Sequence, residues 1–425
     1  MSDDGQSSPP EVAIIGAGLA GLSAALTLRT EAKHARLNLF EKESRIGGRV
    51  LTSQRPSGEH GAEFVLRSEP AIVKILRSLG LGKSAPLDHG ACRFEGHTAR
   101  GSFRTMARHT LNARANQAVI RVFQAAIKAN RSGKYPKGDK PGQWLNQRLR
   151  NDLRARRFLQ MLLLGETCAP WNHLTGRHAL GSFDESETYR IAGGSEQLVQ
   201  ALRRAIPEAR LITESKVTSV RIDGTHASVL WSQNAHHYCA PFDAVIITAP
   251  DGERLLRQRR LRYQPIGHFH AYISVLLEYR QRWWARRLPE LRDGLYTDGP
   301  LNFVEEVPKT IRGRHVLRIL LPNAERWLSR TDPDIEALSL CHLRQLSKDA
   351  QRPIRCSIKR WPHGLPCSGS TTLYDQVSER PAIYLAGDRF AEWPSMSSAL
   401  KSGQRAAKKL ACALRTAPSQ RLQCR

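Results

Sequence analysis

The segment from residue 12 to residue 49 constrains the fold more than any other part of the chain. It opens with four apolar residues, 12–15, which are typical of a buried parallel strand. Gly16, Gly18 and Gly21 follow with the spacing G-x-G-x-x-G, where a strand would turn into a helix. Gly16 permits a tight turn, Gly18 permits close approach of a pyrophosphate, and Gly21 permits close packing of helix on strand.

The continuation of this segment indicates an adenine dinucleotide. A helix is expected from Leu19 to about residue 28, and its N-terminus would face the pyrophosphate. A second strand, 37–40, ends at Glu41, which can accept both ribose hydroxyls and would repel a 2′-phosphate. The alternative, a glycine turn that binds nothing, does not account for Glu41. The dinucleotide contacts expected here are Gly16, Gly18, Ala20, Gly21, Glu41 and Lys42.

The residues after this acid favour a flavin over a nicotinamide. Residues 46–49, IGGR, resemble the GGR element of the monoamine oxidase and L-amino-acid oxidase superfamily. The resemblance implies that Gly48 lies close to the flavin phosphates and that Arg49 contacts the pyrophosphate. Residues 58–64, GEHGAEF, are similar to the next family segment, which runs past the isoalloxazine ring. That similarity implies cofactor contacts from Ala62, Glu63 and Phe64.

The C-terminal part of the chain resembles the second flavin motif of the same family. Residues 382–388 predict a strand, a glycine turn and an acid, and an Ala-rich helix starts at about Met396. In the family, the acid binds the ribityl chain and the helix N-terminus faces the flavin N1–C2 carbonyl, where negative charge appears on reduction. The family usually has Met-Glu-Gly where this chain has Met-Ser-Ser. The implied contacts are Gly387, Asp388, Ser397 and Ser398, with Val217 from midchain at the adenine.

The catalytic centre departs from the family pattern. Many relatives place a lysine near flavin N5, on a strand that leads to a tryptophan. Alignment on Ile273 and Trp284 places Ser274 at that position. A serine cannot supply the positive charge that assists oxygen reduction, so slow use of dioxygen is expected. His268 or His270 could compensate; the alternative is that both are surface histidines.

Three aromatic side chains complete the catalytic candidates. Trp361 stands where relatives have a tryptophan near the flavin, and Trp393 could supply a second wall or pack in the core. His363, in Trp-Pro-His-Gly, resembles the W-x-H-G of bacterial aryl amino-acid oxidases; a structural role in the turn is the alternative. Ser370 falls where some members tether the flavin through cysteine, so non-covalent FAD is expected. Arg67 is the best candidate for a carboxylate clamp.

These patterns predict an α/β fold in which a Rossmann-like FAD-binding domain is interleaved with an α+β substrate domain. The segment from about 85 to 185 has apolar spacing near 3.6 and is expected to form a helical lobe. The polar ends of the chain are expected to be disordered. The expected ranges are 11–80, 188–252 and 380–415 for the FAD domain, 81–187 and 253–379 for the substrate domain, and 1–10 and 416–425 for the ends.

Composition limits the partners and the compartment. The net charge is +26, but arginines are spread along the chain, which favours a solvated basic surface over a nucleic-acid site. Eight scattered cysteines have no metal spacing, so we expect no metal and free thiols in the cytoplasm. No apolar run is long enough for a membrane span, and no signal peptide is visible. The sequence leaves the oligomeric state open.

The sequence therefore predicts an FAD-dependent oxidoreductase that oxidises an amine or amino acid, with dioxygen as one possible acceptor. A renalase-like or desaturase-like flavin oxidoreductase, acting on NAD(P)H-type or C–C substrates, is the alternative. A flavin-binding protein without redox turnover is a third hypothesis, suggested by the basic composition alone.

Overall fold

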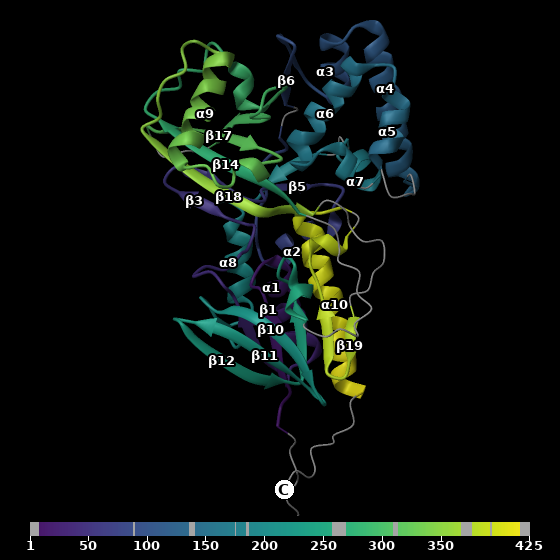
Figure 1. Cartoon of the computed structure of the whole chain (residues 1–425), viewed down its shortest axis with the longest axis vertical. Helices are drawn as coiled ribbons and strands as arrows, with labels where there is room; N and C mark the ends of the chain where they lie inside the picture. The colour runs from purple at the N-terminus through teal and green to yellow at the C-terminus, as the bar shows by residue number, and fades with distance from the viewer. Residues whose placement is uncertain are drawn as a thin grey trace, which may run out of the picture.

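The first layer of the fold is a six-stranded sheet in the lower half of Figure 1. The computed structural model describes residues 8–87, 90–135, 141–174, 176–183, 187–256, 269–308, 313–366, 376–391 and 393–416. All neighbouring strands of this sheet are parallel except the outermost pair, β19 and β20. Its order is β19 (Gln376–Glu379), β20 (Ala382–Leu385), β13 (Ala244–Ile247), β1 (Glu11–Ile15), β2 (Arg36–Phe40) and β9 (Arg210–Ile212).

Both faces of this sheet are buried, which explains the continuous apolar run in β1. Val12 and Ile14 pack into a core on one face, whereas Ala13 and Ile15 pack into a second core on the other. The first core includes α1 (Leu19–Glu31), α2 (Pro70–Ser78), α8 (Glu196–Arg204) and α10 (Met396–Thr416). The second is covered by the sheet of β10 (Lys216–Asp223), β11 (His226–Gln233) and β12 (His236–Phe242).

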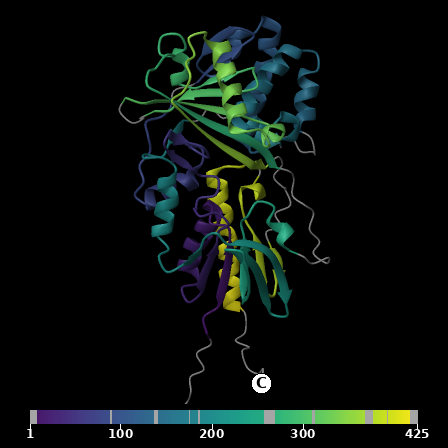
Figure 2. The same ribbon diagram turned by 60° about the vertical axis from the view of Figure 1, so that its left-hand side comes forward.

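Helices α1 and α10 pack closely although they come from opposite ends of the chain. A Cβ atom at Gly403 would overlap the carbonyl oxygen of Ala20, so glycine permits the approach. The Ser23 hydroxyl donates to the carbonyl of Leu400 at 3.0 Å. Figures 1 and 2 show α10 beside α1 in both views. The two segments that resemble flavin motifs are therefore neighbours in space.

The second layer is a seven-stranded, mostly antiparallel sheet in the upper half of Figure 1. Helix α9 (Asp332–Leu346) packs on it and begins with a capping box between Thr331 and Asp334. Only β15 and β6 are parallel neighbours. The order is β18 (Arg355–Pro366), β14 (Phe269–Tyr279), β17 (His315–Leu321), β16 (Phe303–Glu306), β15 (Leu295–Thr297), β6 (Ala91–Phe94) and β7 (His97–Arg100).

A helical lobe covers one side of this sheet. The predicted helical segment contains helices, but residues 91–100 form the hairpin of β6 and β7 instead. Helix α6 begins at Leu153 because Asp152 accepts a hydrogen bond from the backbone N–H of Ala155 at 2.8 Å. The lobe comprises α3 (Phe103–Thr110), α4 (Ala113–Ser132), α5 (Pro141–Leu149), α6 (Leu153–Thr167) and α7 (Gly176–Gly181).

The two sheets confirm the predicted α/β class with a second, mixed domain. The exact domain limits given above remain a prediction. The predicted disordered ends fall largely outside the described residues, which start at residue 8 and stop at residue 416. Within the described part of the chain, no helix is both long enough and apolar enough to cross a membrane.

Candidate cofactor and substrate cavity

One cavity of about 1180 Å³ extends from the glycine turn of the parallel sheet to the inner wall of the second sheet and helical lobe. Its volume exceeds the range of about 300–1,000 Å³ that is usual for small-ligand sites. Gly18 and Arg49 line it on one side, and Glu166, Tyr296 and Arg318 line it on the other. The cavity therefore has room for a large ligand and a second, smaller molecule.

The three motif glycines serve different purposes. Gly16 has φ +104°, and a Cβ there would lie 2.6 Å from the Thr248 hydroxyl. A Cβ at Gly21 would overlap the carbonyl oxygen of Gly16. At Gly18, by contrast, the nearest atom would be Gly48 Cα at an ordinary 3.8 Å. Packing within the protein thus requires Gly16 and Gly21, whereas Gly18 keeps space free on the cavity side.

Glu41 organises the glycine turn as well as facing the cavity. Its Oε2 accepts from the N–H of Ala17 at 3.0 Å, and its Oε1 accepts from the N–H of Glu43 at 3.0 Å. Each carboxylate oxygen has a further lone pair, so the predicted ribose contact is compatible with both bonds. Ala20, Lys42 and Val217 also line the cavity.

Arg49 joins three distant segments beneath the cavity. It forms an ion pair with Asp388 and donates through Nη1 to the carbonyl of Gly364 at 2.8 Å. Burial alone would lower the pKa of Arg49, but the adjacent Asp388 carboxylate raises that pKa above its ordinary value. Gly387, at φ +140°, donates its N–H to the Ser402 hydroxyl. The two predicted flavin segments therefore meet through a charged pair.

At the start of α10, the side chains of Ser397 and Ser398 were expected to contact the cofactor. Met396 and Ala399 line the cavity, whereas the Ser397 and Ser398 side chains do not. Ser397 is buried, and the Ser398 hydroxyl accepts from the N–H of Ser395 at 2.7 Å. A cofactor contact at this position would therefore involve the backbone N–H groups of the helix rather than the two hydroxyls.

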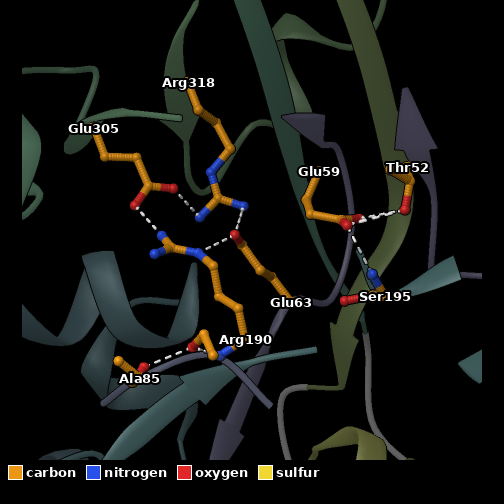
Figure 3. A network of polar contacts seen from close by, with 9 residues as sticks. Thr52, Glu59, Glu63, Ala85, Arg190, Ser195, Glu305 and Arg318 are labelled. Atoms are coloured by element: carbon orange, nitrogen blue, oxygen red, sulfur yellow. Dashed lines mark hydrogen bonds and ion pairs between the residues drawn. The ribbon is translucent and has the colours of Figure 1, made fainter. Parts of the chain in front are cut away.

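Glu63 belongs to a buried ion-pair network that the sequence did not predict (Figure 3). It pairs with Arg190 and, at 2.5 Å, with Arg318. Glu305 pairs with the same two guanidinium groups at 2.8 and 2.5 Å. We call these four residues the Arg–Glu tetrad. Glu63 also lines the cavity, and its contact with the cofactor remains a prediction.

The tetrad connects the layers of the protein at the cavity. Arg190 ends β8 (Thr188–Arg190), which pairs with β5 (Phe64–Leu66). Glu305 and Arg318 lie on β16 and β17 of the second sheet. Phe64 is 39% exposed and lines the cavity, with the two guanidinium carbons 5.2 and 5.5 Å from its ring centre. Cation–π contacts therefore orient Phe64 at the cavity wall.

A second polar cluster in Figure 3 fixes the start of helix α8. Glu59, on β4 (Ser57–Glu59), accepts from the N–H of Ser195 at 2.8 Å and from the hydroxyl of Thr52, on β3 (Thr52–Gln54). Burial raises the pKa of Glu59 despite these bonds. The cluster positions the segment that follows the Gly193–Gly194 turn.

The two tryptophans among the catalytic candidates, Trp361 and Trp393, line the cavity. The indole N–H of Trp361 donates to the carbonyl of His60 at 2.8 Å, and its ring lies 6.2 Å from that of Tyr272. Trp393 fits against α7 because Gly181 has no Cβ, which would overlap the indole. Trp361 and Tyr272 therefore form an aromatic wall of the cavity, and Trp393 lines the same cavity.

Ser274 does not reach that wall. It is fully buried, and its hydroxyl lies 3.2 Å from Nδ1 of His60, whose Nε2 lies 2.9 Å from the hydroxyl of Ser357. Serine is too short to pass the His60 imidazole that covers it. The expectation that Ser274 stands among the catalytic residues is therefore corrected by its position. In the strand register Ser274 pairs with Lys359, which does line the cavity.

The remaining candidates have structural partners. His363 lines the cavity and its Nε2 lies 3.1 Å from Oδ2 of Asp251. His270 is buried, not on the surface, between Glu325 and His173. Arg67 pairs with Glu187 and does not line the cavity, so the structure does not support it as a clamp. His268 and Ser370 lie outside the described residues.

The burial of His60 predicts a specific acid sensitivity. Desolvation, together with Arg318 and Lys359, lowers its pKa from 6.5 to about 4. Between these two pH values the unfolded chain binds more protons than the folded protein does. The free energy of unfolding therefore decreases as the pH falls from 6.5 towards 4. For one group the decrease is at most about 1.4 kcal/mol per pH unit. The urea concentration at the midpoint of unfolding should fall between pH 7 and pH 5 in the wild type. It should fall less in His60→Gln. Parallel losses in variant and wild type would contradict this.

The chain belongs to the family of flavin-containing amine oxidoreductases, whose family model matches residues 19–411. Among curated relatives, lysine-specific histone demethylase 1 homolog 1 of Arabidopsis thaliana is 27% identical over 278 residues, which cover 60% of this chain and 31% of that protein. The L-amino-acid oxidase of Mus musculus is 39% identical over 79 residues, 18% of this chain and 12% of that protein. The chain thus matches less than a third of either relative.

Solved structures share the fold over nearly the whole chain. Putrescine oxidase bound to putrescine is 18% identical with a TM-score of 0.75, covering 95% of this chain and 99% of that one. Cyclohexylamine oxidase from Brevibacterium oxydans is 17% identical with a TM-score of 0.74, covering 96% and 100%. A protein described as a protoporphyrinogen oxidase from Exiguobacterium sp. is 17% identical with a TM-score of 0.76, covering 96% and 100%.

Proposed function

We propose that this flavin oxidoreductase uses non-covalently bound FAD to oxidise an amine at the aromatic end of the cavity. The continuity of one cavity from the glycine turn to the aromatic wall is the observation that carries the proposal. The residues present suit FAD: Gly18 leaves space beside Gly48, α1 starts without a side-chain cap, and Glu41 faces the same space. Bound FAD would supply the two-electron acceptor that the side chains lack.

The protein's own contribution is to orient and desolvate the amine. Trp361 and Tyr272 offer the amine an apolar surface, and Trp393 adds a further aromatic side chain to the cavity lining. Burial raises the pKa of the Tyr272 phenol, which therefore stays protonated and uncharged at neutral pH. Putrescine oxidase and cyclohexylamine oxidase, named above for their shared fold, support an amine as the substrate.

The tetrad is a poor clamp for the carboxylate of an amino-acid substrate. A substrate carboxylate needs a cation with a free face, and both Arg190 and Arg318 already bind two carboxylates. An added carboxylate would meet Glu63 and Glu305 at the same place. The tetrad is therefore not a clamp for a substrate carboxylate, although Arg292 and Lys359 also line the cavity.

Anaerobic mixing of the purified yellow protein with amines, L-amino acids and NAD(P)H tests the proposal. Bleaching of the flavin by amines is the expected result. Bleaching of the flavin by NAD(P)H, with no bleaching by amines, would instead favour the renalase-like alternative. The structural neighbour described as a protoporphyrinogen oxidase favours the second alternative, oxidation of a C–C bond. Acid precipitation should release FAD into the supernatant, and colour retained in the pellet would contradict non-covalent binding.

Glu41→Gln should weaken FAD binding while leaving a folded protein. Glutamine keeps one acceptor oxygen, so the N–H of Ala17 or that of Glu43 loses its partner, and the charge-assisted bonds to ribose are lost. We expect a loss of about 1.5–3 kcal/mol, the usual range for hydrogen bonds to a charged group. Fluorescence titration of the apoprotein with FAD measures it. Unchanged affinity would remove Glu41 from the binding site.

Lys359 is the cation that could assist reoxidation in place of the missing lysine. Its Nζ lies 5.0 Å from the centre of the Trp361 ring, and burial lowers its pKa. We predict slow reaction of the reduced enzyme with dioxygen, slower still in Lys359→Met, with flavin reduction by amine unchanged. Mixing pre-reduced enzyme with oxygenated buffer measures the rate. Equal reoxidation in both proteins would exclude Lys359 from this role.

A further inference from the structure

The longest helix of the helical lobe, α4, carries no negative charge. Its 20 residues include no aspartate and no glutamate. The neighbouring helices α3 and α5 also lack an acid, and α6 has only Glu166, which lines the cavity. The helices of the lobe therefore supply almost no negative charge to balance the cations on their outer surface.

The exposed face of α4 is a single row of cations and amides. We call its six exposed side chains the basic row; they are Arg114, Gln117, Arg121, Gln124, Lys128 and Arg131. Successive members are three or four residues apart, so all six fall within an arc of about 100° and extend over about 25 Å of the helix. The opposite face, which includes Val119 and Phe123, is buried in the lobe. Burial of this apolar face therefore fixes the direction in which the row points.

The cations of the basic row have no acidic partner in the protein. Among the residues that the structure describes, no acid forms an ion pair with a member of the row, whereas Arg154 and Arg157 on α6 both bind Glu95. Arg114 donates to the carbonyl of Asn151 at 3.3 Å, which leaves its other N–H groups available. Figure 1 shows α4 at the right-hand edge of the lobe, on the side away from α9. The row therefore offers four positive charges to a partner outside the molecule.

The composition of the row fits phosphate groups better than a bilayer or a protein surface. Helices that lie on membranes expose Trp, Phe or Leu beside their cations, and protein interfaces have an apolar centre. On the described surface of the lobe, Leu153 on α6 is the one exposed large hydrophobic side chain, and it lies outside the row. Arginine, lysine and glutamine all donate to phosphate oxygens. Proteins that bind single strands also use aromatic side chains for stacking, and the row has none.

We infer that the basic row of α4 binds the phosphate backbone of double-stranded nucleic acid without sequence preference. No member of the row lines the cavity, so this binding is independent of the proposed oxidation. The sequence favoured a solvated basic surface because arginines are spread along the chain; on α4 the fold aligns four cations on one face. No bond is made or broken in this step, and the cations of the row replace counterions of the duplex.

The test titrates the holoenzyme into a short, fluorescently labelled DNA duplex and follows anisotropy at several salt concentrations. The logarithm of the binding constant should fall with the logarithm of salt concentration with a slope of about −3 to −4, because each neutralised phosphate contributes about −0.9. Arg121→Gln combined with Lys128→Gln should reduce this slope by about 2, and Lys128→Gln alone by about 1. Lys74→Gln combined with Arg77→Gln, both exposed on α2, removes the same charge and is the matched control. The control should leave the slope unchanged.

Three results would overturn the inference. The first is an equal loss of slope in the two double variants, which would show an effect of net charge rather than of the row. The second is no binding of the duplex at about 50 mM salt, where contacts to phosphates are strong. The third is tighter binding to vesicles of phosphatidylcholine and phosphatidylglycerol than to the duplex, lost in the Arg121 and Lys128 variant, which would assign the row to a membrane. Flavin reduction should be equal in all these proteins, so failure of the proposed oxidation leaves this test intact.

Discussion

Arg318→Met is expected to destabilise the protein by about 3–5 kcal/mol, the cost of breaking a buried ion pair by removing one partner. Arg318 is 2% exposed and binds Glu63 and Glu305 at 2.5 Å each. Without it, two enclosed carboxylates would share Arg190 alone. Urea unfolding of the holoenzyme, followed by circular dichroism, measures the loss.

The exposed pair of Arg67 and Glu187 is the matched control. It has a similar separation, 2.6 Å, but the two side chains are 69% and 44% exposed. Solvent screens such a pair, so Arg67→Met should leave the unfolding midpoint nearly unchanged. An equal effect of Arg318→Met and Arg67→Met would contradict the buried character of the tetrad.

A double-mutant cycle tests the network directly. Glu305→Gln removes one of the two carboxylates that Arg318→Met would leave uncompensated. The double variant should therefore be more stable than the sum of the two single losses predicts, because the sites share partners. Additive losses would show that the two residues act independently.

The parts of the fold that the sequence predicted are those determined by local pattern. Strand β1, helix α1 and the position of Glu41 follow from apolar runs, glycine spacing and one acid within 30 residues of chain. Arg49 and the segment 61–64, which the sequence also singled out, line the cavity. Such local patterns can be interpreted without information about residues that are distant in the sequence.

The tetrad could not be predicted in the same way. The four charges come from positions 63, 190, 305 and 318, and the sequence singled out only Glu63, as a cofactor contact rather than as an ion-pair partner. Their meeting depends on pairing β5 with β8 and on the second sheet. Ser274 lies on strand β14, but the sequence pattern contained no information about His60, whose Nδ1 lies 3.2 Å from the Ser274 hydroxyl.

Gly18→Val is expected to abolish FAD binding without unfolding the protein. The Cβ atom of the valine would meet only Gly48 Cα, at 3.8 Å, so we expect the protein to fold. The two methyl groups would extend into the cavity and occupy space that FAD needs. Gly21→Val is the contrasting variant. Its Cβ would overlap Gly16 O, and it should therefore misfold. Circular dichroism separates the two outcomes, and FAD titration measures binding.

The most direct test of the central claim is the absorbance spectrum of the purified protein mixed with amines in the absence of oxygen. The account predicts that wild-type protein carries flavin absorbance, that an amine bleaches it, and that Gly18→Val, folded but colourless, gives no signal. A wild-type flavin that no amine bleaches, or a Gly18→Val variant that binds FAD and reacts normally, would contradict it.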